Sequence, residues 1–363
     1  MRLLRTYVLK EFFHQFVIML SVFTFVLLVG NLVKLADLLI NKGVHPLHVA
    51  QLFLNLLPYL LSYAIPMAVL TGTLLAFGRL AADNEITAMR ATGITLYRIG
   101  VPMAVLGLIF SILCLWIHDR WMPEARFASR RLLKEIGVKR PTAYLEPGTF
   151  IKDFEGYVLF IYGIEDEELL NVRIYQPQEG KPTRTIIAER GTFTFSPLDQ
   201  TLRLTLYDGT SDEPDLRDPT TFYKLNFREY IVTMHYKRDL SETIEKKPKD
   251  MTIDELRQEI QRMTEQAVDP TPLRAELHKK FSLSFSSLVF VLLAFPLAVI
   301  TRRGERAIGF GVSLIVIIGY YILMAVGDAL ALRQLCPPML SIWFPNVLLL
   351  TIGLILLHKV ATQ

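Results

Sequence analysis

The chain has 363 residues, of which 52% are hydrophobic and 20% are charged, and its mean hydropathy is +0.35. This composition excludes an ordinary soluble domain, because the apolar residues also come in blocks long enough to cross a bilayer. The net charge of +4 excludes little by itself, so the positions of the charges carry the information. The sequence therefore predicts a polytopic membrane protein.

Three apolar segments occupy the N-terminal region, which we expect to form a first domain over residues 1–117. The first segment, Phe12 to Ile40, is longer than a signal-peptide core and no cleavage site follows it, so it should remain as a span. The second and third segments cover residues 50–78 and 99–117. Each of the three is long enough to cross a bilayer as a helix.

A polar segment, residues 79–98, lies between the second and third spans and predicts a short helix outside the bilayer over about residues 83–93. Asp83 should cap its start, and Gly93 should take the left-handed conformation just past its end. Such a helix is roughly 13 Å long and marginal alone, so it must dock on something. It is either a connector folded back on its own protein or a docking surface for a cytoplasmic partner.

The composition changes in residues 118–280, which are charged and contain no run long enough to cross a membrane. Residues 142–234 hold six or so short β-rich runs separated by turn signals, and residues 201–207 alternate strictly between polar and apolar. This spacing predicts an antiparallel sandwich or an open barrel. Thr252 and Glu255 have capping-box spacing, which predicts a linker helix over residues 252–265.

Three further spans are expected in residues 281–363, so the chain should cross the membrane six times and keep both termini on one side. Short segments on that side hold ten basic residues, whereas the short loops opposite hold two. The positive-inside rule therefore makes the side of the termini cytoplasmic, and the long β domain is exported. The ten are Arg2, Arg5, Lys10, Arg79, Arg90, Arg98, Arg302, Arg303, Arg306 and Lys359, and the two are Lys42 and Arg333.

Several ionisable residues within or beside the spans are candidates for function. Asp328 lies inside the fifth span and should face the bundle interior or an aqueous cavity, because a lipid-facing carboxylate is costly. Lys34 and Asp37 lie one turn apart near the end of the first span, where they could pair, or where Lys34 could attract an anionic amphiphile. Cys114 and Cys336 could form a disulfide, but they have no metal-binding spacing.

Three functions fit a membrane bundle with an exported β domain and a helical loop. The chain could be the permease subunit of an ATP-driven transporter, a secondary transporter that uses Asp328 as a proton site, or an intramembrane enzyme. The last two need several ionisable groups within the spans, and this chain offers few. The sequence has no phosphate-binding loop, HExxH, GxSxG or dinucleotide fingerprint, and no inverted repeat of three-span halves.

A set of short motifs along the whole chain resembles the LptF/LptG permeases of the lipopolysaccharide exporter. These motifs are the basic N-terminus, Pro58 and Pro66 in the second span, Asp83-Asn-Glu-Ile-Thr-Ala-Met-Arg-Ala-Thr-Gly93, Arg274-Ala-Glu-Leu-His278, Phe295-Pro-Leu297, the loop from Arg302 to Arg306, and Trp343-Phe-Pro-Asn346. The order of three spans, an exported domain and three more spans also fits this family.

The resemblance implies an α-helical polytopic membrane protein with six transmembrane helices and an inserted periplasmic antiparallel β-jellyroll-like domain. It implies a place in the inner membrane of a Gram-negative-type bacterium, with both termini cytoplasmic and a paralogous permease as heterodimer partner. Lipopolysaccharide would be extracted from the inner membrane and passed to a periplasmic transfer protein. A cytoplasmic ABC ATPase dimer would bind ATP and Mg²⁺, so we expect no cofactor, no metal and no ATPase activity for this chain itself. We also expect no nucleic-acid partner. The alternative remains a proton-coupled secondary transporter of an amphiphile that uses Asp328.

The resemblance also implies roles for single residues. The ATPase would dock on the segment at residues 83–93, where Glu85 matches the family's acidic coupling position. Lys34 matches a basic position near the lipid's phosphates, and the first and fifth spans would form a lateral gate. The implied coupling residues are Asp83, Glu85, Ile86, Met89, Arg90 and Gly93, and those of the cavity and gate are Lys34, Asp37, Tyr320, Tyr321, Met324 and Asp328. Leu202, Leu204 and Leu206 are candidates for an apolar groove in the β domain, or else for its ordinary core.

Overall fold

The computed structural model describes residues 2–40, 44–139, 148, 150–154, 156–165, 168–178, 181–196, 201–214, 222–235, 246–301 and 306–362. The chain divides into two compact units. A helical unit comprises residues 1–35, 51–129 and 246–363, and a β unit comprises residues 36–50 and 130–245.

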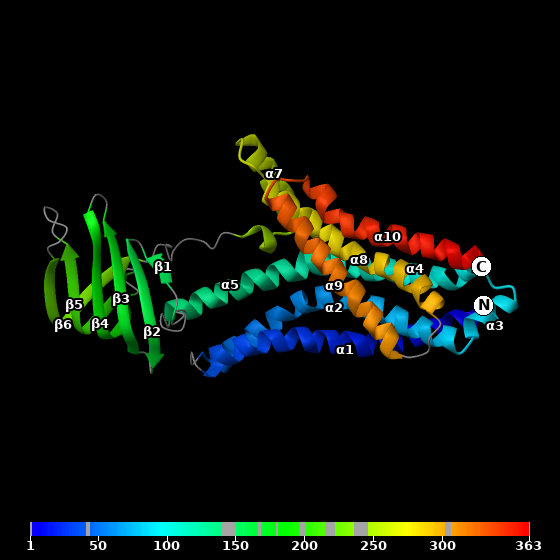
Figure 1. The fold of residues 1–363 in the computed structure, drawn as a ribbon, viewed down its shortest axis with the longest axis horizontal. Helices are drawn as coiled ribbons and strands as arrows, with labels where there is room; N and C mark the ends of the chain where they lie inside the picture. The colour runs from blue at the N-terminus through cyan, green and yellow to red at the C-terminus, as the bar shows by residue number, and fades with distance from the viewer. Residues whose placement is uncertain are drawn as a thin grey trace. The chain divides into compact units, whose positions relative to one another are not determined.

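Six helical segments among the described residues are long and apolar enough to cross a membrane, as the sequence predicted. In the helical unit both termini lie at the same end of the bundle (Figure 1). The third segment is longer than expected, because α4 continues through a π-helical turn, η1, into α5. The elements are α1 (Arg2–Ile40), α2 (Pro46–Ala82), α3 (Glu85–Ala91), α4 (Leu96–Trp116), η1 (Ile117–Trp121), α5 (Met122–Lys139), η2 (Pro248–Asp250), α7 (Ile253–Glu265), α8 (Thr271–Thr301), α9 (Arg306–Leu332) and α10 (Pro338–Thr362).

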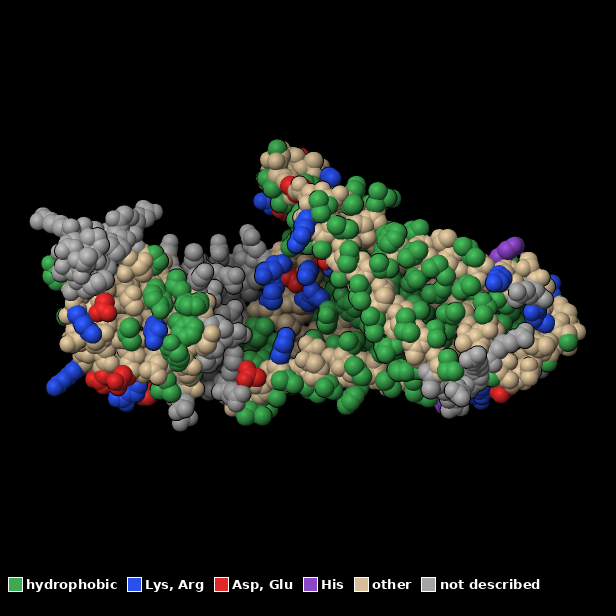
Figure 2. All heavy atoms as spheres, viewed as in Figure 1, with side chains coloured by type: hydrophobic (Ala, Val, Ile, Leu, Met, Phe, Trp, Pro, Cys, Tyr) green, Lys and Arg blue, Asp and Glu red, His purple; other side chains and the backbone are tan. Residues whose placement is uncertain are grey.

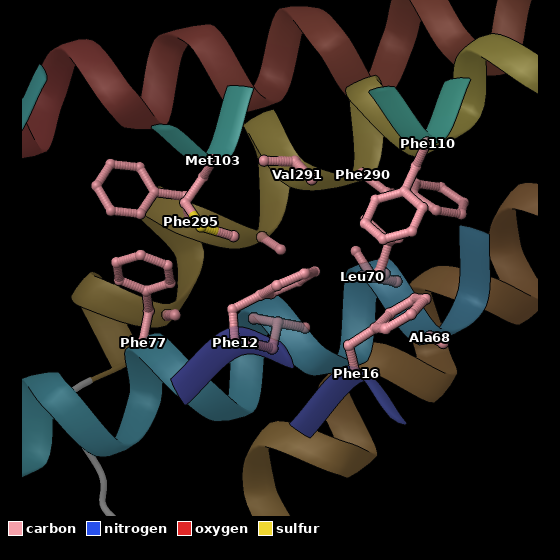
Figure 3. Close-up of a cluster of buried hydrophobic side chains, with 14 of the residues drawn as sticks. Phe12, Phe16, Ala68, Leu70, Phe77, Met103, Phe110, Phe290, Val291 and Phe295 are labelled. Carbon is pink, nitrogen blue, oxygen red and sulfur yellow. The ribbon is translucent and has the colours of Figure 1, made fainter. Parts of the chain in front are cut away.

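Aromatic side chains fill the centre of the helical unit (Figure 3). The rings of Phe16 in α1 and Phe110 in α4 have centroids 4.7 Å apart, and those of Phe77 in α2 and Phe295 in α8 are 4.8 Å apart in an edge-to-face arrangement. Such ring pairs stabilise beyond the area that they bury. Because lipid is as apolar as these side chains, the helices associate through this kind of close packing.

Two glycines allow helices of the bundle to approach closely. A Cβ atom on Gly107 in α4 would lie 3.1 Å from the Cα atom of Leu288 in α8. A Cβ atom on Gly353 in α10 would lie 3.0 Å from the carbonyl oxygen of Leu292, also in α8. Small residues at helix crossings are typical of membrane bundles. The contacts place α8 at the centre, between α4 and α10.

The outward faces of the helices are apolar (Figure 2). Val26 in α1 is 61% exposed, Ile315 in α9 is 73% exposed and Ile355 in α10 is 62% exposed. An exposed apolar surface of this extent would be unfavourable in water, whereas it suits the hydrocarbon core of a bilayer. The pattern agrees with a multi-pass membrane protein whose helices face lipid.

The β unit contains the expected antiparallel β domain. Its six described strands form one sheet in the order β1-β2-β3-β4-β5-β6, and every neighbouring pair is antiparallel. This sequential order is a meander, so the described strands do not divide into the two sheets of a sandwich. The strands are β1 (Phe150–Phe154), β2 (Tyr157–Glu165), β3 (Glu168–Gln178), β4 (Lys181–Ser196), β5 (Thr201–Pro214) and β6 (Phe222–His235).

The alternation predicted for residues 201–207 places two leucines of β5 in the core of the sheet. Leu204 and Leu206 are fully buried in one apolar cluster with side chains from the other strands. Leu202 lies on the same strand opposite Met234, and its side chain is outside the described part of the structure. Leu204 and Leu206 pack as core here, and a groove-lining role for these leucines stays a prediction.

The capping box expected at the start of the linker helix is present in α7. The backbone N–H of Glu255 donates to the Thr252 hydroxyl at 3.3 Å, and the backbone N–H of Thr252 donates to the Glu255 carboxylate at 2.8 Å. Lys246 donates to the same carboxylate at 2.5 Å. Burial alone would raise the pKa of Glu255, but these hydrogen bonds lower it below its ordinary value. The start of α7 is thus held by polar contacts on both sides.

Replacing Thr252 with alanine tests this cap. We expect Thr252→Ala to destabilise α7 by about 1 kcal/mol, because one N–H at the start of the helix loses its acceptor. The protection of α7 amides in hydrogen exchange should then fall about fivefold. Thr264→Ala is the control, because the Thr264 hydroxyl only bonds the carbonyl of Ile260 within the same helix. Equal protection of α7 in both variants would contradict the role of the cap.

Candidate functional site

The helix between the second and third spans, α3, ends as the sequence predicted. Gly93 has a φ of +83°, in the left-handed region that glycine adopts at little cost. The N–H of Gly93 donates to the carbonyl of Arg90 at 2.9 Å, and that of Ile94 donates to the carbonyl of Met89 at 3.3 Å. These two bonds form a Schellman motif, which satisfies carbonyl groups left free at the end of the helix.

The predicted capping of α3 by Asp83 is wrong. The helix begins at Glu85 after Asn84, which has a φ of +57° and makes no side-chain hydrogen bond to the cap. Asparagine tolerates this left-handed conformation, so the chain turns between α2 and α3 at Asn84. The Asp83 carboxylate instead lies 4.0 Å from the Nε atom of Arg79, one turn back in α2.

The two apolar side chains that the sequence assigned to ATPase coupling anchor α3 to its own bundle. Ile86 is 3% exposed, and Met89 packs against the main apolar core. Glu85 and Arg90 are half-buried, while Thr87 and Ala88 are exposed. The helix therefore has one face that packs into the apolar core of the bundle and one face that is exposed. The exposed face lies at the end that carries both termini (Figure 1).

A polar cluster joins α3 to the first two helices. The hydroxyl of Tyr7 in α1 donates to Oε1 of Glu85 at 3.0 Å and accepts from Nη2 of Arg79 at 2.9 Å. Nη1 of Arg79 lies 3.1 Å from the carboxylate of Glu11, one turn further along α1. Glu85, the implied coupling residue, is thus already engaged within the chain. Sequence reasoning missed Tyr7 and Glu11 as its neighbours, although their i, i+4 spacing places them on one helix face.

An ion pair fixes the position of Asp328. Nζ of Lys279 in α8 lies 2.6 Å from Oδ2 of Asp328 in α9, and the two side chains are 18% and 27% exposed. The sequence assigned Lys279 to the region before the fourth span, but α8 begins at Thr271 and carries this lysine into the bundle. The pair joins α8 to α9. Asp328 therefore has a structural role that sequence reasoning did not find.

The other candidate residues of α9 contact neighbouring helices. The ring of Tyr320 lies 4.9 Å from that of Phe290 in α8, and the ring of Tyr321 lies 5.7 Å from that of Tyr63 in α2. Tyr320 and Met324 are buried. These side chains belong to the bundle core in this conformation. A cavity between α9 and its neighbours would require α9 to move away from them.

The two implied gate helices touch within this chain. Phe23 of α1 and Phe310 of α9 have stacked rings with centroids 6.5 Å apart. Further along α1, Lys34 is exposed and Asp37 is half-buried. The exposed ammonium of Lys34 is accessible to an anionic group, as its predicted role requires.

A second lysine of α8 was missed by sequence reasoning. Lys280 is 1% exposed, and its ammonium group donates to the carbonyls of His118 at 2.8 Å and Met251 at 2.6 Å. His118 belongs to the π-helical turn η1, and Met251 directly follows η2, two residues before α7 begins. Asp119 of the same turn accepts from the backbone N–H of Ile253 at 2.7 Å. A lysine inside a span indicates that it has a partner within the protein. The sequence did not give this indication, because the fourth span was expected to begin one residue after Lys280.

The cysteines and other metal-binding side chains form no cluster in the described part of the chain. Cys114 is buried in α4 and Cys336 is exposed, and both are free thiols. No group of three or more His, Cys, Asp or Glu side chains among the described residues could hold a metal ion.

Six apolar helices, with an antiparallel β domain inserted in the sequence between the third and fourth spans, define a multi-pass membrane protein among the described residues. The family model described as "Lipopolysaccharide export system permease LptF/LptG" matches residues 6–359. The chain belongs to this family. It is a permease subunit of lipopolysaccharide export and a multi-pass protein of the inner membrane.

Several relatives carry the names of the two permeases of this system. The chain is 23% identical over 317 residues to the lipopolysaccharide export system permease protein LptF of Escherichia coli (strain K12), covering 85% of this chain and 82% of the relative. It is 26% identical over 205 residues to LptG of the same strain, covering 56% and 55%. It is 24% identical over 137 residues to LptG of Haemophilus influenzae, covering 38% of each.

The Lys279–Asp328 pair yields a test of how α9 is held. We expect Asp328→Leu to destabilise the protein by about 1 to 2 kcal/mol, because it leaves a half-buried ammonium group unpaired. The double replacement Lys279→Met with Asp328→Leu should recover most of that loss. Thermal denaturation of the purified protein in detergent measures both, with the exposed Lys359→Met as the control. Equal losses in the single and double variants would show that the pair does not hold α9.

Proposed function

We propose that this permease is driven by a cytoplasmic ABC ATPase dimer that docks on α3 and presents basic side chains to Glu85. The observation that carries the proposal is the two-sided construction of α3. Ile86 and Met89 fix the helix to the bundle, and its opposite face is exposed at the end of the termini. The basic residues of the short segments at that end support a cytoplasmic position under the positive-inside rule.

The local charge around α3 suits a basic partner. The carboxylates of Glu11, Asp83 and Glu85 all lie within 4.0 Å of the Arg79 guanidinium. The single positive charge of Arg79 thus faces three carboxylates, so these four side chains together carry a net negative charge. Glu85 has 31% of its side chain exposed, so an arginine or lysine of a partner has access to it. ATP and Mg²⁺ would be held by the partner, and this chain would contribute no nucleotide ligand.

The rest of the chain supports lipid extraction. We infer that lipopolysaccharide leaves the inner membrane sideways between α1 and α9 and passes along the β unit to a periplasmic transfer protein, while a paralogous permease supplies the other half of the path. The exposed apolar faces of the helices suit acyl chains. Lys34 offers an exposed cation to the phosphates of the lipid. Neither the family nor the contacts of Asp328 supports a proton-coupled alternative.

Reversing the charge of Glu85 tests the docking role. We expect Glu85→Lys to abolish co-purification of the ATPase and ATP-driven lipid extraction, because two cations then face each other across the interface. Glu85→Gln removes the charge without adding repulsion, so it should weaken docking about 10- to 100-fold. Co-purification from membranes and lipid release from reconstituted vesicles are the measurements.

The control for this experiment is Glu265→Lys, which makes the same change of charge on the exposed end of α7, away from α3. Membrane insertion and thermal stability of Glu85→Lys are measured alongside, so that loss of docking is separated from loss of folding. A well-folded Glu85→Lys variant that retains the ATPase and full lipid extraction would refute the proposal.

A further inference from the structure

The start of α1 is bound to the coupling helix by a chain of three polar groups. Arg79 donates to the Tyr7 hydroxyl at 2.9 Å, and that hydroxyl donates in turn to Glu85 at 3.0 Å. A direct contact between Arg79 and Glu85 is longer, with Nη2 and Oε1 3.9 Å apart. The Tyr7 hydroxyl therefore provides the short connection between Glu85 of α3 and the helices α1 and α2.

The same face of α1 holds Arg79 a second time. Nη1 of Arg79 lies 3.1 Å from the Glu11 carboxylate, whose side chain is only 13% exposed. Tyr7 and Glu11 are four residues apart, so they lie on one side of α1, and both contact the Arg79 guanidinium. Because the Glu85 carboxylate is the acceptor, a second, charged donor bound to it would weaken its hydrogen bond from the Tyr7 hydroxyl. The charge of that donor would also repel Arg79 toward Glu11.

The contacts among Tyr7, Glu11, Arg79 and Glu85, called the clasp below, matter because the packed face of α1 is a narrow stripe. Phe12, Phe16 and Phe23 pack into the core. Val17 and Val33 are 56% and 72% exposed, so much of the helix surface meets no part of the chain. A helix with a narrow packed stripe moves at low cost compared with one buried on all sides. A change in the clasp at its first turns can therefore alter the position of α1.

We propose that Tyr7 and Arg79 are positioning residues that relay occupation of α3 by the ATPase to α1. This inference rests on the proposed docking role of Glu85 and adds a route by which docking reaches the membrane. When a basic side chain of the ATPase binds Glu85, the carboxylate leaves the Tyr7 hydroxyl. The start of α1 then separates from α3 while it stays attached to Arg79 through Glu11. The Tyr7 hydroxyl is thus the group that couples docking to movement of α1. Without it, the docked ATPase would hydrolyse ATP without moving α1.

Removing one hydroxyl group tests the relay. We expect Tyr7→Phe to retain the ATPase but to lower lipid extracted per ATP hydrolysed by about 3- to 10-fold, because one charge-assisted hydrogen bond is lost. Tyr97→Phe is the matched control, since Tyr97 is 50% exposed in the first turns of α4 at the same end of the bundle. Both rates are measured on the whole exporter in vesicles containing lipopolysaccharide. An unchanged ratio in Tyr7→Phe would overturn the relay.

The double variant Tyr7→Phe with Glu85→Gln shows whether Tyr7 acts through Glu85. If it does, the double variant loses no more coupling than Glu85→Gln alone, whereas independent effects multiply. Multiplying losses would overturn the relay.

A spin label on α1 reports the movement itself. With Cys336→Ser as background, a label at Val17→Cys should change its mobility when ATP is added, and Tyr7→Phe should reduce that change at least threefold. An equal ATP response of the label with and without the Tyr7 hydroxyl would overturn the relay. If the ATPase fails to bind the parent protein, the docking proposal falls instead, so the two failures are distinguishable.

Discussion

A cation held inside an apolar helix bundle must find oxygen atoms, because an unpaired charge away from water costs several kcal/mol. In this protein that requirement applies most strongly to Lys280, which is 1% exposed, and less to Lys279 and Arg79, whose side chains are 18% and 33% exposed. Arg79 finds Glu11 and the Tyr7 hydroxyl, which joins α2 to α1. Lys279 and Lys280 point to different partners from adjacent positions of α8, and so connect it to α9 and to the segment before α7. The aromatic side chains of the core pack between the helices that these polar contacts join.

The helices implied in lipid exit expose much of their surface, as α4 and α10 also do. α8 lies between α4 and α10 in close contact with both, whereas α1 and α9 expose apolar side chains along most of their length. A lipid with a large polar head leaves a bilayer sideways, which requires elements that separate from the rest without unfolding it. Such elements come from the less stable parts of a fold. The Phe23–Phe310 contact and the Lys279–Asp328 pair are then the interactions that opening would break.

The sequence was sufficient for features set by local chemistry. Apolar length predicted the six spans, a glycine predicted the end of α3, and threonine–glutamate spacing predicted the start of α7. It was insufficient where neighbouring side chains compete for one position, or where the partner lies on another helix. Asp83 was assigned to a cap, but Arg79 competes for its carboxylate and Asn84 takes the turn. Lys279 and Lys280 lay just outside the predicted fourth span, so their partners in α9 and η1 could not be inferred from apolar periodicity.

The two interpretations of residues 79–98 are compatible with one another. A helix as short as α3 does not persist without tertiary contacts, so Ile86 and Met89 must first bind it to the bundle. That attachment holds the backbone in place and leaves Glu85 at the boundary between the bundle and the exposed face. A carboxylate in this position can exchange an internal donor, the Tyr7 hydroxyl, for an external one. In the proposed function, the connector is therefore what would let the docking surface act on the membrane helices.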